Sequence, residues 1–419
     1  MNNILASLKI ALRAMSANKG RTALTVLGIT IGIMSVIIVY SAGAGIRGLL
    51  VGQLEAFGTN IIQVEIKVPT MKKGSSGDTQ SSMALASGVQ VTTLKLQDMN
   101  DIKKIANISD CYGALMSQDL AGYGNEQRKV SLFGVSPSYL NIDKSQIAQG
   151  DFFTASDEDS LAEVVVLGSK IKTNLFGDSD AIGRYITLHK SKYKVIGIMK
   201  SRGATFGMDL DSYVYVPLRT LQKKVMGLDH MMYMICQLKD NNSSGDTAEQ
   251  VKSILRINHN ISNPDRDDFR VSTMDDMMKT LNTVTDALTW LLLAIVAISL
   301  VVGGVGILNI MYVIVSERTA EIGLRKAVGA NYKNIMVQFL VEAVLITFIG
   351  AVAGIVLGIL FSALIALGAN KFGFDWQFSI PLTSIIVALV FAFACGLGFG
   401  VYPAKRAAKL DPIEALRRE

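Results

Sequence analysis

Residues 287–316 read ALTWLLLAIVAISLVVGGVGILNIMYVIVS, thirty positions without a charged side chain. A helix needs about 20 apolar residues to cross a ~30 Å hydrocarbon core, so this stretch predicts a membrane-spanning helix. Three other stretches are equally free of charge, at residues 22–46, 343–370 and 376–404. We therefore predict four transmembrane helices, at residues 22–46, 287–316, 333–369 and 380–403.

Lys and Arg residues near the spans predict the orientation, because cytoplasmic segments carry an excess of them. Three basic segments fall on one side of a four-span topology: the N-terminal segment 1–21, the loop after the second span and the tail 404–419. Both termini are therefore expected in the cytoplasm, in a multi-pass protein of the cell membrane. The net charge of +6 follows from this distribution and indicates no nucleic-acid partner.

The first span has a rival interpretation as a signal peptide. It follows a basic start and ends near Ala42-Gly43-Ala44. The apolar run of 22–46 is longer than the 7–15 residues typical of a signal peptide, so we favour a retained span.

The polar residues between the first two spans predict one large extracytoplasmic domain of the α+β class. Two sets of strand, helix and strand patterns, at residues 60–138 and 222–273, predict a βαβ-type porter subdomain. A β-rich insert with a single helix near residues 169–175 splits it at 139–221. Two further segments, 47–59 and 274–286, continue the helical spacing of the spans and predict a stalk. A mobile loop is predicted at 71–88, and a short outer loop at 370–379.

No arrangement of side chains in the sequence is typical of a catalytic or metal site. The three cysteines, Cys111, Cys236 and Cys395, form no C-x-x-C pair. Cys111 and Cys236 pair only if the fold brings them together. Three histidines in polar contexts are expected to be solvated: His189, His230 and His259. The acidic run at 265–268 follows Pro264 and is expected to be a solvated turn rather than a calcium site.

The loop after the second span has helical spacing. Glu321 precedes Arg325 by four residues, the favoured order for an ion pair on one helix face. Ile322, Leu324 and Val328 are expected to give this helix an apolar side. The alternative is a solvated loop whose charges serve only the topology.

These segments resemble the permease subunits of the MacB/FtsX-type ABC transporters, also called type VII or mechanotransmission transporters. The resemblance runs in order along nearly the whole chain. It rests on ERTAEIGLRKAVGA (317–330), QFLVEA (338–343), YPAKRAAKLDPIEALR (402–417), NKGRTALTVLGITIG (18–32), GDFF (150–153), VVLG (165–168), LFG (175–177), AIG (181–183) and VIGI (195–198). The insert motifs are similar to the family's periplasmic core domain.

The resemblance implies a homodimer whose coupling helix, at 317–332, docks into an ABC ATPase, with a membrane-fusion-type adaptor outside. The implied coupling residues are Glu317, Arg318, Glu321, Ile322, Arg325 and Lys326. Glu342, an acid at the start of the third span, is expected to snorkel or to pair with a loop base such as Arg325. The sequence contains no G-x-x-x-x-G-K-[ST] phosphate loop, so ATP and Mg are expected on a separate ATPase subunit.

The implied function is export of amphiphilic compounds, antibiotics or antimicrobial peptides. Two alternatives remain open at this point. One is a non-transporting mechanotransmitter that regulates a cell-wall hydrolase, and the other is a lipoprotein-extracting permease. A membrane enzyme is not favoured, because no catalytic group is evident.

A tag inserted within residues 71–88 tests the topology. We expect an impermeant label to reach it on intact cells, because this segment is predicted to be extracytoplasmic. Labelling that requires permeabilised cells would contradict the predicted orientation.

Overall fold

The structure is a computed structural model. It describes residues 19–55, 60–67, 91–124, 126–205, 208–372, 374 and 376–417. The predicted loop 71–88 and most of the N-terminal segment 1–21 lie outside these residues. The chain divides into two compact units: residues Met1–Leu50 with Leu281–Glu419, and Val51–Thr280.

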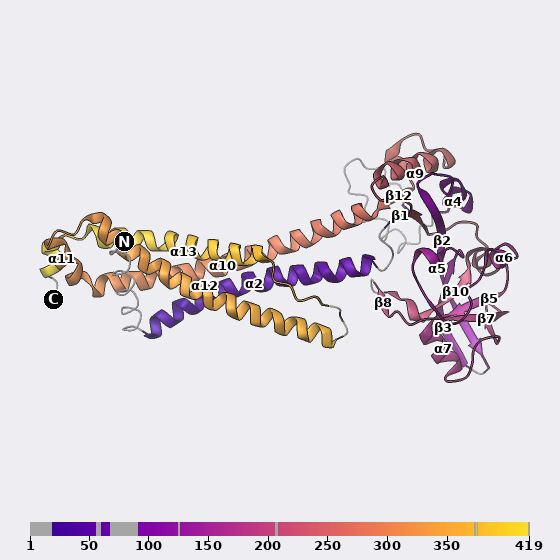
Figure 1. The fold of residues 1–419 in the computed structure, drawn as a ribbon, viewed down its shortest axis with the longest axis horizontal. Helices are drawn as coiled ribbons and strands as arrows, with labels where there is room; N and C mark the ends of the chain where they lie inside the picture. The colour runs from indigo at the N-terminus through magenta and orange to yellow at the C-terminus, as the bar shows by residue number, and fades with distance from the viewer. Residues whose placement is uncertain are drawn as a thin grey trace. The chain divides into compact units, whose positions relative to one another are not determined.

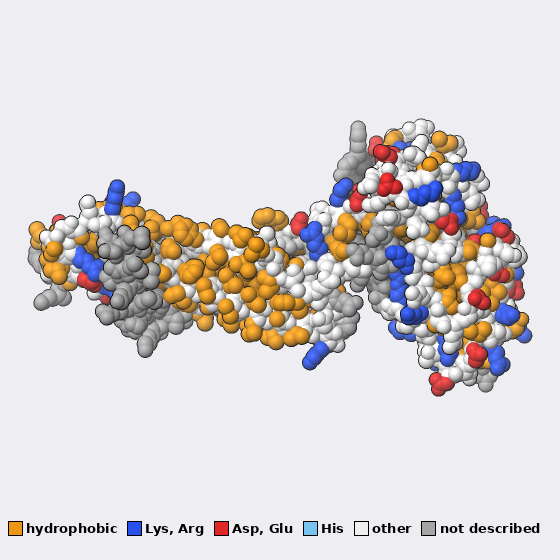
Figure 2. All heavy atoms as spheres, in the orientation of Figure 1, with side chains coloured by type: hydrophobic (Ala, Val, Ile, Leu, Met, Phe, Trp, Pro, Cys, Tyr) orange, Lys and Arg blue, Asp and Glu red, His pale blue; other side chains and the backbone are white. Residues whose placement is uncertain are grey.

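Four long helices in the described residues confirm the predicted transmembrane architecture (Figure 1). They are α2 (Lys19–Glu55), α10 (Met274–Glu317), α12 (Tyr332–Lys371) and α13 (Leu382–Lys409). At ~1.5 Å per residue, the 44 residues of α10 extend about 66 Å, well beyond a ~30 Å hydrocarbon core. Hydrophobic side chains cover most of the visible surface of these helices (Figure 2).

Glycines set the packing of α12 against α2. Gly350, Gly354 and Gly358 lie one turn apart, and each faces an isoleucine of α2. An added Cβ at Gly354 would lie 2.8 Å from the Cβ of Ile33. Small residues let helix backbones approach closely in a membrane, where packing rather than burial from water drives association. Gly354 and Gly358 thus allow the backbone of α12 to approach α2 closely.

The second unit contains one ten-stranded mixed sheet. Its main path is β12-β1-β11-β2-β3-β10-β5-β7-β4, and β6 pairs with β2 and β7. The strands are β1 (Ile61–Ile66), β2 (Ile108–Tyr123), β3 (Glu126–Val135), β4 (Ile147–Gly150), β5 (Val164–Leu167), β6 (Tyr185–Leu188), β7 (Ser191–Met199), β10 (Tyr213–Pro217), β11 (Tyr233–Leu238) and β12 (Phe269–Thr273). A separate two-stranded hairpin comprises β8 (Ala204–Thr205) and β9 (Met208–Asp209).

The insert strands and the porter strands share this sheet, because the long β2 and β3 reach both groups. β2, the longest strand of the unit, was not predicted from the sequence. The prediction of one helix in the insert was also wrong, since three short helices form there before β10: α5 (Tyr139–Ile142), α6 (Ala155–Asp159) and α7 (Ser169–Phe176). α6 begins with a capping box, in which Thr154 and Asp157 satisfy each other's backbone N–H groups.

Both faces of the sheet are covered. On one face, α4 (Leu96–Ile102), α7 and α9 (Ser244–Asn258) contribute to the larger core, through side chains such as Ile102, Leu175 and Val251. On the other, an aromatic cluster around Tyr139 packs with α5 and the first turn of α10. Alternate side chains of the central strands serve the two cores, as the period of two requires; in β2, for example, Cys111 belongs to the larger core and Tyr112 to the aromatic one.

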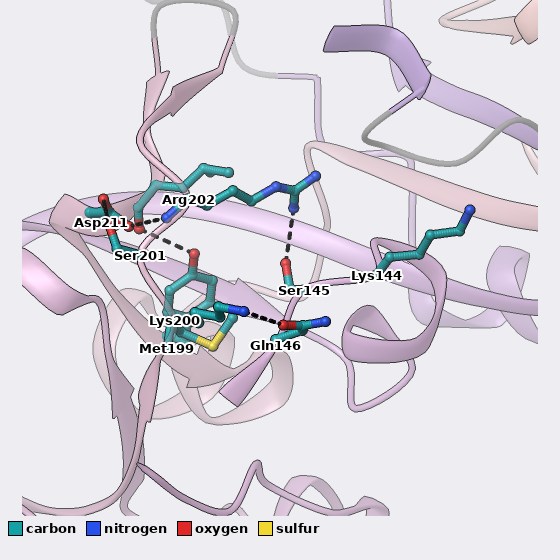
Figure 3. A pocket seen from close by; sticks show the side chains of 10 residues that line it. Lys144, Ser145, Gln146, Met199, Lys200, Ser201, Arg202 and Asp211 are labelled. Carbon is teal, nitrogen blue, oxygen red and sulfur yellow. Dashed lines mark hydrogen bonds between the residues drawn. The ribbon is translucent and has the colours of Figure 1, made fainter. Parts of the chain in front are cut away.

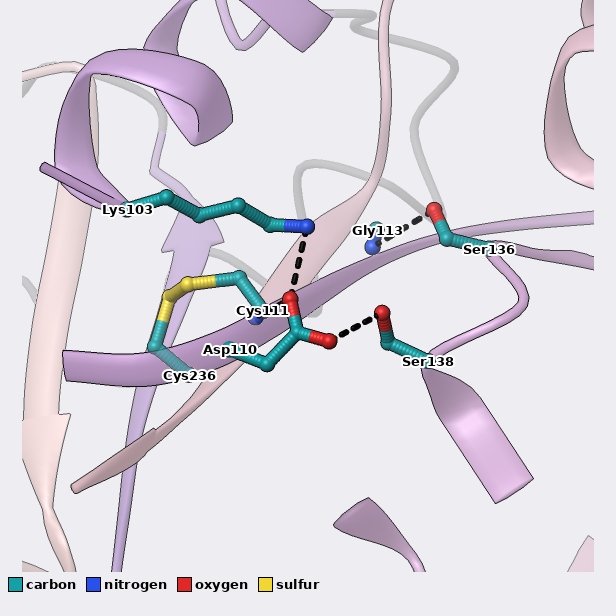
Figure 4. The surroundings of a disulfide bond; sticks show 7 residues. All are labelled: Lys103, Asp110, Cys111, Gly113, Ser136, Ser138 and Cys236. Carbon is teal, nitrogen blue, oxygen red and sulfur yellow. Dashed lines mark hydrogen bonds and ion pairs between the residues drawn. A yellow bond between two sulfur atoms is a disulfide. The ribbon is translucent and has the colours of Figure 1, made fainter. Parts of the chain in front are cut away.

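A disulfide joins β2 and β11 within the larger core (Figure 4). Cys111 of β2 and Cys236 of β11 are direct partners in the antiparallel register, although 125 residues separate them. Beside the bond, Asp110 pairs with Lys103 at 2.7 Å and accepts a hydrogen bond from Ser138. The odd number of cysteines gave no support for this bond. Disulfides persist in oxidising compartments, which supports a location outside the cytoplasm.

Two of the three histidines are buried, so the prediction of solvated histidines was wrong for them. His230 is 6% exposed. The side chain of His259 is 3% exposed and lies between Asp268 (Nδ1–Oδ1, 2.7 Å) and Asp98 (Nε2–Oδ2, 3.4 Å). The acidic run 265–268 is not a simple solvated turn either, because Asp267 pairs with Arg256 and Asp268 with His259. Asp98 comes from α4, Arg256 comes from α9, and His259 follows α9 directly. The residues next to each of these side chains in the sequence do not reveal such pairings.

The charges around His259 make the free energy of unfolding decrease at alkaline pH. Burial acts to lower the pKa of His259, but hydrogen bonds to Asp268 and Asp98 outweigh it and raise the pKa to about 9. The raised pKa stabilises the fold fully below the ordinary value of 6.5, and this is lost as the pH rises through about 9. At ~1.4 kcal/mol per pKa unit, the loss is on the order of 3 kcal/mol.

Scanning calorimetry at pH 7 and pH 10 measures the effect. The unfolding temperature of the wild type is expected to fall between pH 7 and pH 10. In His259→Gln we expect this fall to be smaller, whereas His189→Gln, at an exposed site, should show the same fall as the wild type. Equal declines in the wild type and in His259→Gln would contradict the assignment.

Candidate functional site: the helix between the second and third spans

The predicted loop helix is present as α11 (Thr319–Ala327). Glu321 lies in its first turn, and Arg325 and Lys326 lie in its last, which suits the helix dipole. Its end is a Schellman motif: Ala330 N donates to Arg325 O at 2.9 Å, and Gly329 N donates to Lys326 O at 3.1 Å. Gly329 has φ +101°, a conformation that only glycine adopts without strain.

The inner face of α11 packs on the short C-terminal helix α14 (Pro412–Arg417). Gly323 makes the close approach possible, since a Cβ there would lie 2.8 Å from the Cβ of Ala415. Ile322 beside it is 3% exposed and belongs to the core of the helical unit. Ile322 therefore lies against its own chain.

Two basic residues tie α11 to the helices around it. Lys326 Nζ donates to the carbonyl oxygens of Ala408 (3.0 Å) and Leu410 (2.6 Å), at the C-terminal end of α13. Arg325 forms the predicted pair with Glu321 at 2.5 Å. It also donates to Gln338 of α12 at 2.6 Å. These contacts fix how α11 is rotated about its axis.

A buried pair of opposite charges lies at the corner between α10 and α11. Glu342 of α12 is 1% exposed, and its Oε2 lies 3.9 Å from Nη1 of Arg318. The expected pairing of Glu342 with a loop base is confirmed, but the base is Arg318. Arg325, the base named as the example, is held by Glu321 and Gln338 instead. Arg318 Nη1 and Glu342 Oε1 have no hydrogen-bond partner among the described residues. The pair therefore links the corner to α12 by charge alone.

The outer face of α11 is mostly apolar. Its exposed residues recur at helical spacing: Ala320, Glu321, Leu324, Ala327 and Val328. Leu324 is 58% exposed and Val328 is 83% exposed. α14 adds Leu416, which lies beside Gly323, and Ile413, which is 77% exposed. We call these seven exposed residues of the two contacting helices the docking face.

The structure divides the predicted coupling residues into two groups. Glu317 and Glu321 are exposed. Ile322 is buried, and Arg318, Arg325 and Lys326 make contacts within the chain. The expected single apolar side was wrong, because Ile322 lies about 200° around the helix from Leu324. The spacing of Leu324 and Val328 was a signal for the outer face, whereas nothing local indicated Ile413 or Leu416.

Comparison with known proteins agrees with this architecture. Residues 22–254 match the family described as "MacB-like periplasmic core domain", and residues 293–412 match "FtsX-like permease C-terminal". The fold and the loop helix thus define a membrane permease of the ABC-transporter type with an extracytoplasmic domain. The chain belongs to the MacB-like family.

Two relatives carry the name "Macrolide export ATP-binding/permease protein MacB". That of Wolinella succinogenes is 35% identical over 414 residues, and that of Azoarcus sp. is 34% identical over 421 residues. The alignments cover 99% and 100% of this chain, but 61% and 60% of the relatives. The chain therefore spans about three-fifths of their length. The crystal structure of the periplasmic region of MacB from Actinobacillus actinomycetemcomitans matches with a TM-score of 0.45 and 21% identity, over 55% of this chain and 95% of that structure.

Lys326→Met tests whether Lys326 anchors α11 and α14. Two charge-assisted hydrogen bonds to carbonyl oxygens are lost, so we expect the C-terminal end to be less stable by about 1–3 kcal/mol. Hydrogen–deuterium exchange of residues 408–417 should rise roughly tenfold or more. Lys333→Met removes an equal charge from an exposed position nearby and is expected to change nothing. Equal exchange in the two variants would show that the anchor is unimportant.

Proposed function

We propose that this chain is the membrane permease part of an ATP-driven ABC exporter, and that an ATPase on another polypeptide binds the docking face. The observation that carries the proposal is an outward apolar face on a helix whose inner face is anchored. An exposed apolar patch on an otherwise charged loop marks a site of protein contact. Leu324, Val328 and Ile413 are the side chains we expect to enter the partner.

The anchoring contacts explain how force would pass into the membrane. Lys326 holds α11 to the end of α13. Two contacts hold α11 to α12: Arg325 donates to Gln338, and Arg318 pairs with Glu342. A displacement of α11 on ATP binding would therefore move both following spans rather than bend a flexible loop. The ATPase would supply ATP and Mg binding, and this chain would supply only the mechanical link.

The remaining parts of the proposal rest on charge distribution and on the relatives. The Lys and Arg residues around the spans support a cytoplasmic position for α11 and both termini. The macrolide export named for the relatives supports an amphiphilic cargo, such as an antibiotic or an antimicrobial peptide. We further propose that the permease works as a homodimer with a membrane-fusion-type adaptor.

Charge substitutions in the docking face test the proposal. The full chain is purified with its co-purifying ATPase, and ATP hydrolysis is measured after reconstitution in liposomes. We expect Leu324→Asp and Val328→Asp each to reduce permease-stimulated hydrolysis tenfold or more, because a central apolar side chain of an interface contributes about 2 kcal/mol or more. Glu321→Lys is expected to act in the same direction.

Ile257→Asp is the matched control, since Ile257 is 72% exposed on α9 of the other unit. It should leave hydrolysis unchanged. Full stimulation by Leu324→Asp and Val328→Asp would overturn the docking assignment.

A further inference from the structure

The α/β unit contains a cavity that the proposed function does not use. Its volume is about 210 Å³. Three segments meet around it: the turn before β4, the loop after β7, and the 3₁₀ turn η1 (Leu210–Ser212) (Figure 3). Small-molecule pockets usually occupy ~300–1,000 Å³, so this cavity has room for a small group or for one end of a larger molecule.

The floor of the cavity is apolar. Met199, Leu210 and Tyr215 line it, and each is less than a tenth exposed. The Tyr215 hydroxyl donates to the Leu210 carbonyl at 3.2 Å. Since this hydroxyl proton is already engaged, a group that reaches the floor meets mainly carbon and sulfur.

The rim of the cavity is basic. Lys200 and Arg202 contribute positive charges, and Lys144 lines the cavity too, although its ammonium group points away from theirs (Figure 3). Asp211 lines the cavity too, but its carboxylate accepts from Arg202 N (2.9 Å), Gly203 N (3.1 Å) and the Ser201 hydroxyl (2.7 Å). This acid is therefore committed to shaping the loop and is poorly placed to bind a cation.

Two residues of the turn before β4 hold Arg202 in position. Its guanidinium pairs with Asp143, which is 1% exposed, and donates to the Ser145 hydroxyl at 3.0 Å. Lys200 contacts the neutral Gln146 amide oxygen at 3.0 Å. Among the described residues, neither Lys144 nor Lys200 forms an ion pair, so the Lys200 cation at the rim remains available to an anion and Lys144 adds an uncompensated charge nearby.

The turn that carries Lys144 is strained. Lys144 has φ +57°, a left-handed conformation that costs a non-glycine residue about 1–2 kcal/mol. Asp143 and Ser145 on either side are fixed by Arg202, and this holds the turn. Such strain persists where surrounding contacts enforce it, often at ligand sites.

We propose that this cavity binds a small anionic group on a short apolar chain. The anion lies at the rim near Lys200 and Arg202, and the chain covers Met199, Leu210 and Tyr215. The proposal does not depend on the docking face, because it concerns the extracytoplasmic unit alone. It gives this domain a recognition site for one end of an anionic amphiphile.

Methyl NMR of the full chain in lipid nanodiscs tests the site, with ¹³C-methyl methionine as the label and Met199→Leu to assign its signal. Hexyl phosphate is the probe, and inorganic phosphate and hexyl glucoside are its matched fragments. We expect saturable shifts of the Met199 signal with hexyl phosphate. Each fragment should bind at least tenfold more weakly, because it lacks either the chain or the charge.

The double variant Lys144→Gln, Lys200→Gln should weaken hexyl phosphate binding at least tenfold. Both residues are exposed, so the variant is expected to fold. Lys192→Gln, an exposed residue on β7, is the control and should bind as the wild type does. An unmoved Met199 signal, equal binding of either fragment, or equal binding by the double variant would overturn the proposal.

Discussion

The cation of Lys326 against the last carbonyls of α13 is the interaction on which the account of the helical unit depends. The final carbonyl groups of any helix lack partners within it, and a charged donor satisfies them strongly. Here that donor comes from α11, so the same contact ends α13 and fixes the rotation of α11. Because Lys326 and Gly323 point inward, Leu324 and Val328 must point outward. The apolar docking face thus follows from where a basic residue is held.

The features predicted correctly from the sequence are those set by nearby residues. Charge-free runs identified all four spans, and the Glu321–Arg325 spacing identified α11. The features missed depend on partners far along the chain. Lys326 contacts carbonyls 82 and 84 residues away, and Cys111 pairs across 125 residues. No local sequence pattern predicts such partners, because only the completed fold brings them together.

The histidine prediction shows the same limit. His259 has a polar neighbourhood in sequence, which suggested a solvated side chain. In the fold, Asp98 and Asp268 surround it, and their charges allow a buried and protonated imidazole. The family resemblance supplied what spacing did not, namely the role that we propose for the loop helix. It named the helix but not the face that is free to bind.

Cross-linking from Ile413 tests most directly whether the docking face binds an ATPase. A photoreactive benzoyl-phenylalanine at position 413 is irradiated in native membranes, and the adducts are identified by mass spectrometry. We expect an adduct with a polypeptide that contains a G-x-x-x-x-G-K-[ST] phosphate loop, and no such adduct from position 257. Adducts with lipid alone, or the same ATPase adduct from both positions, would contradict it.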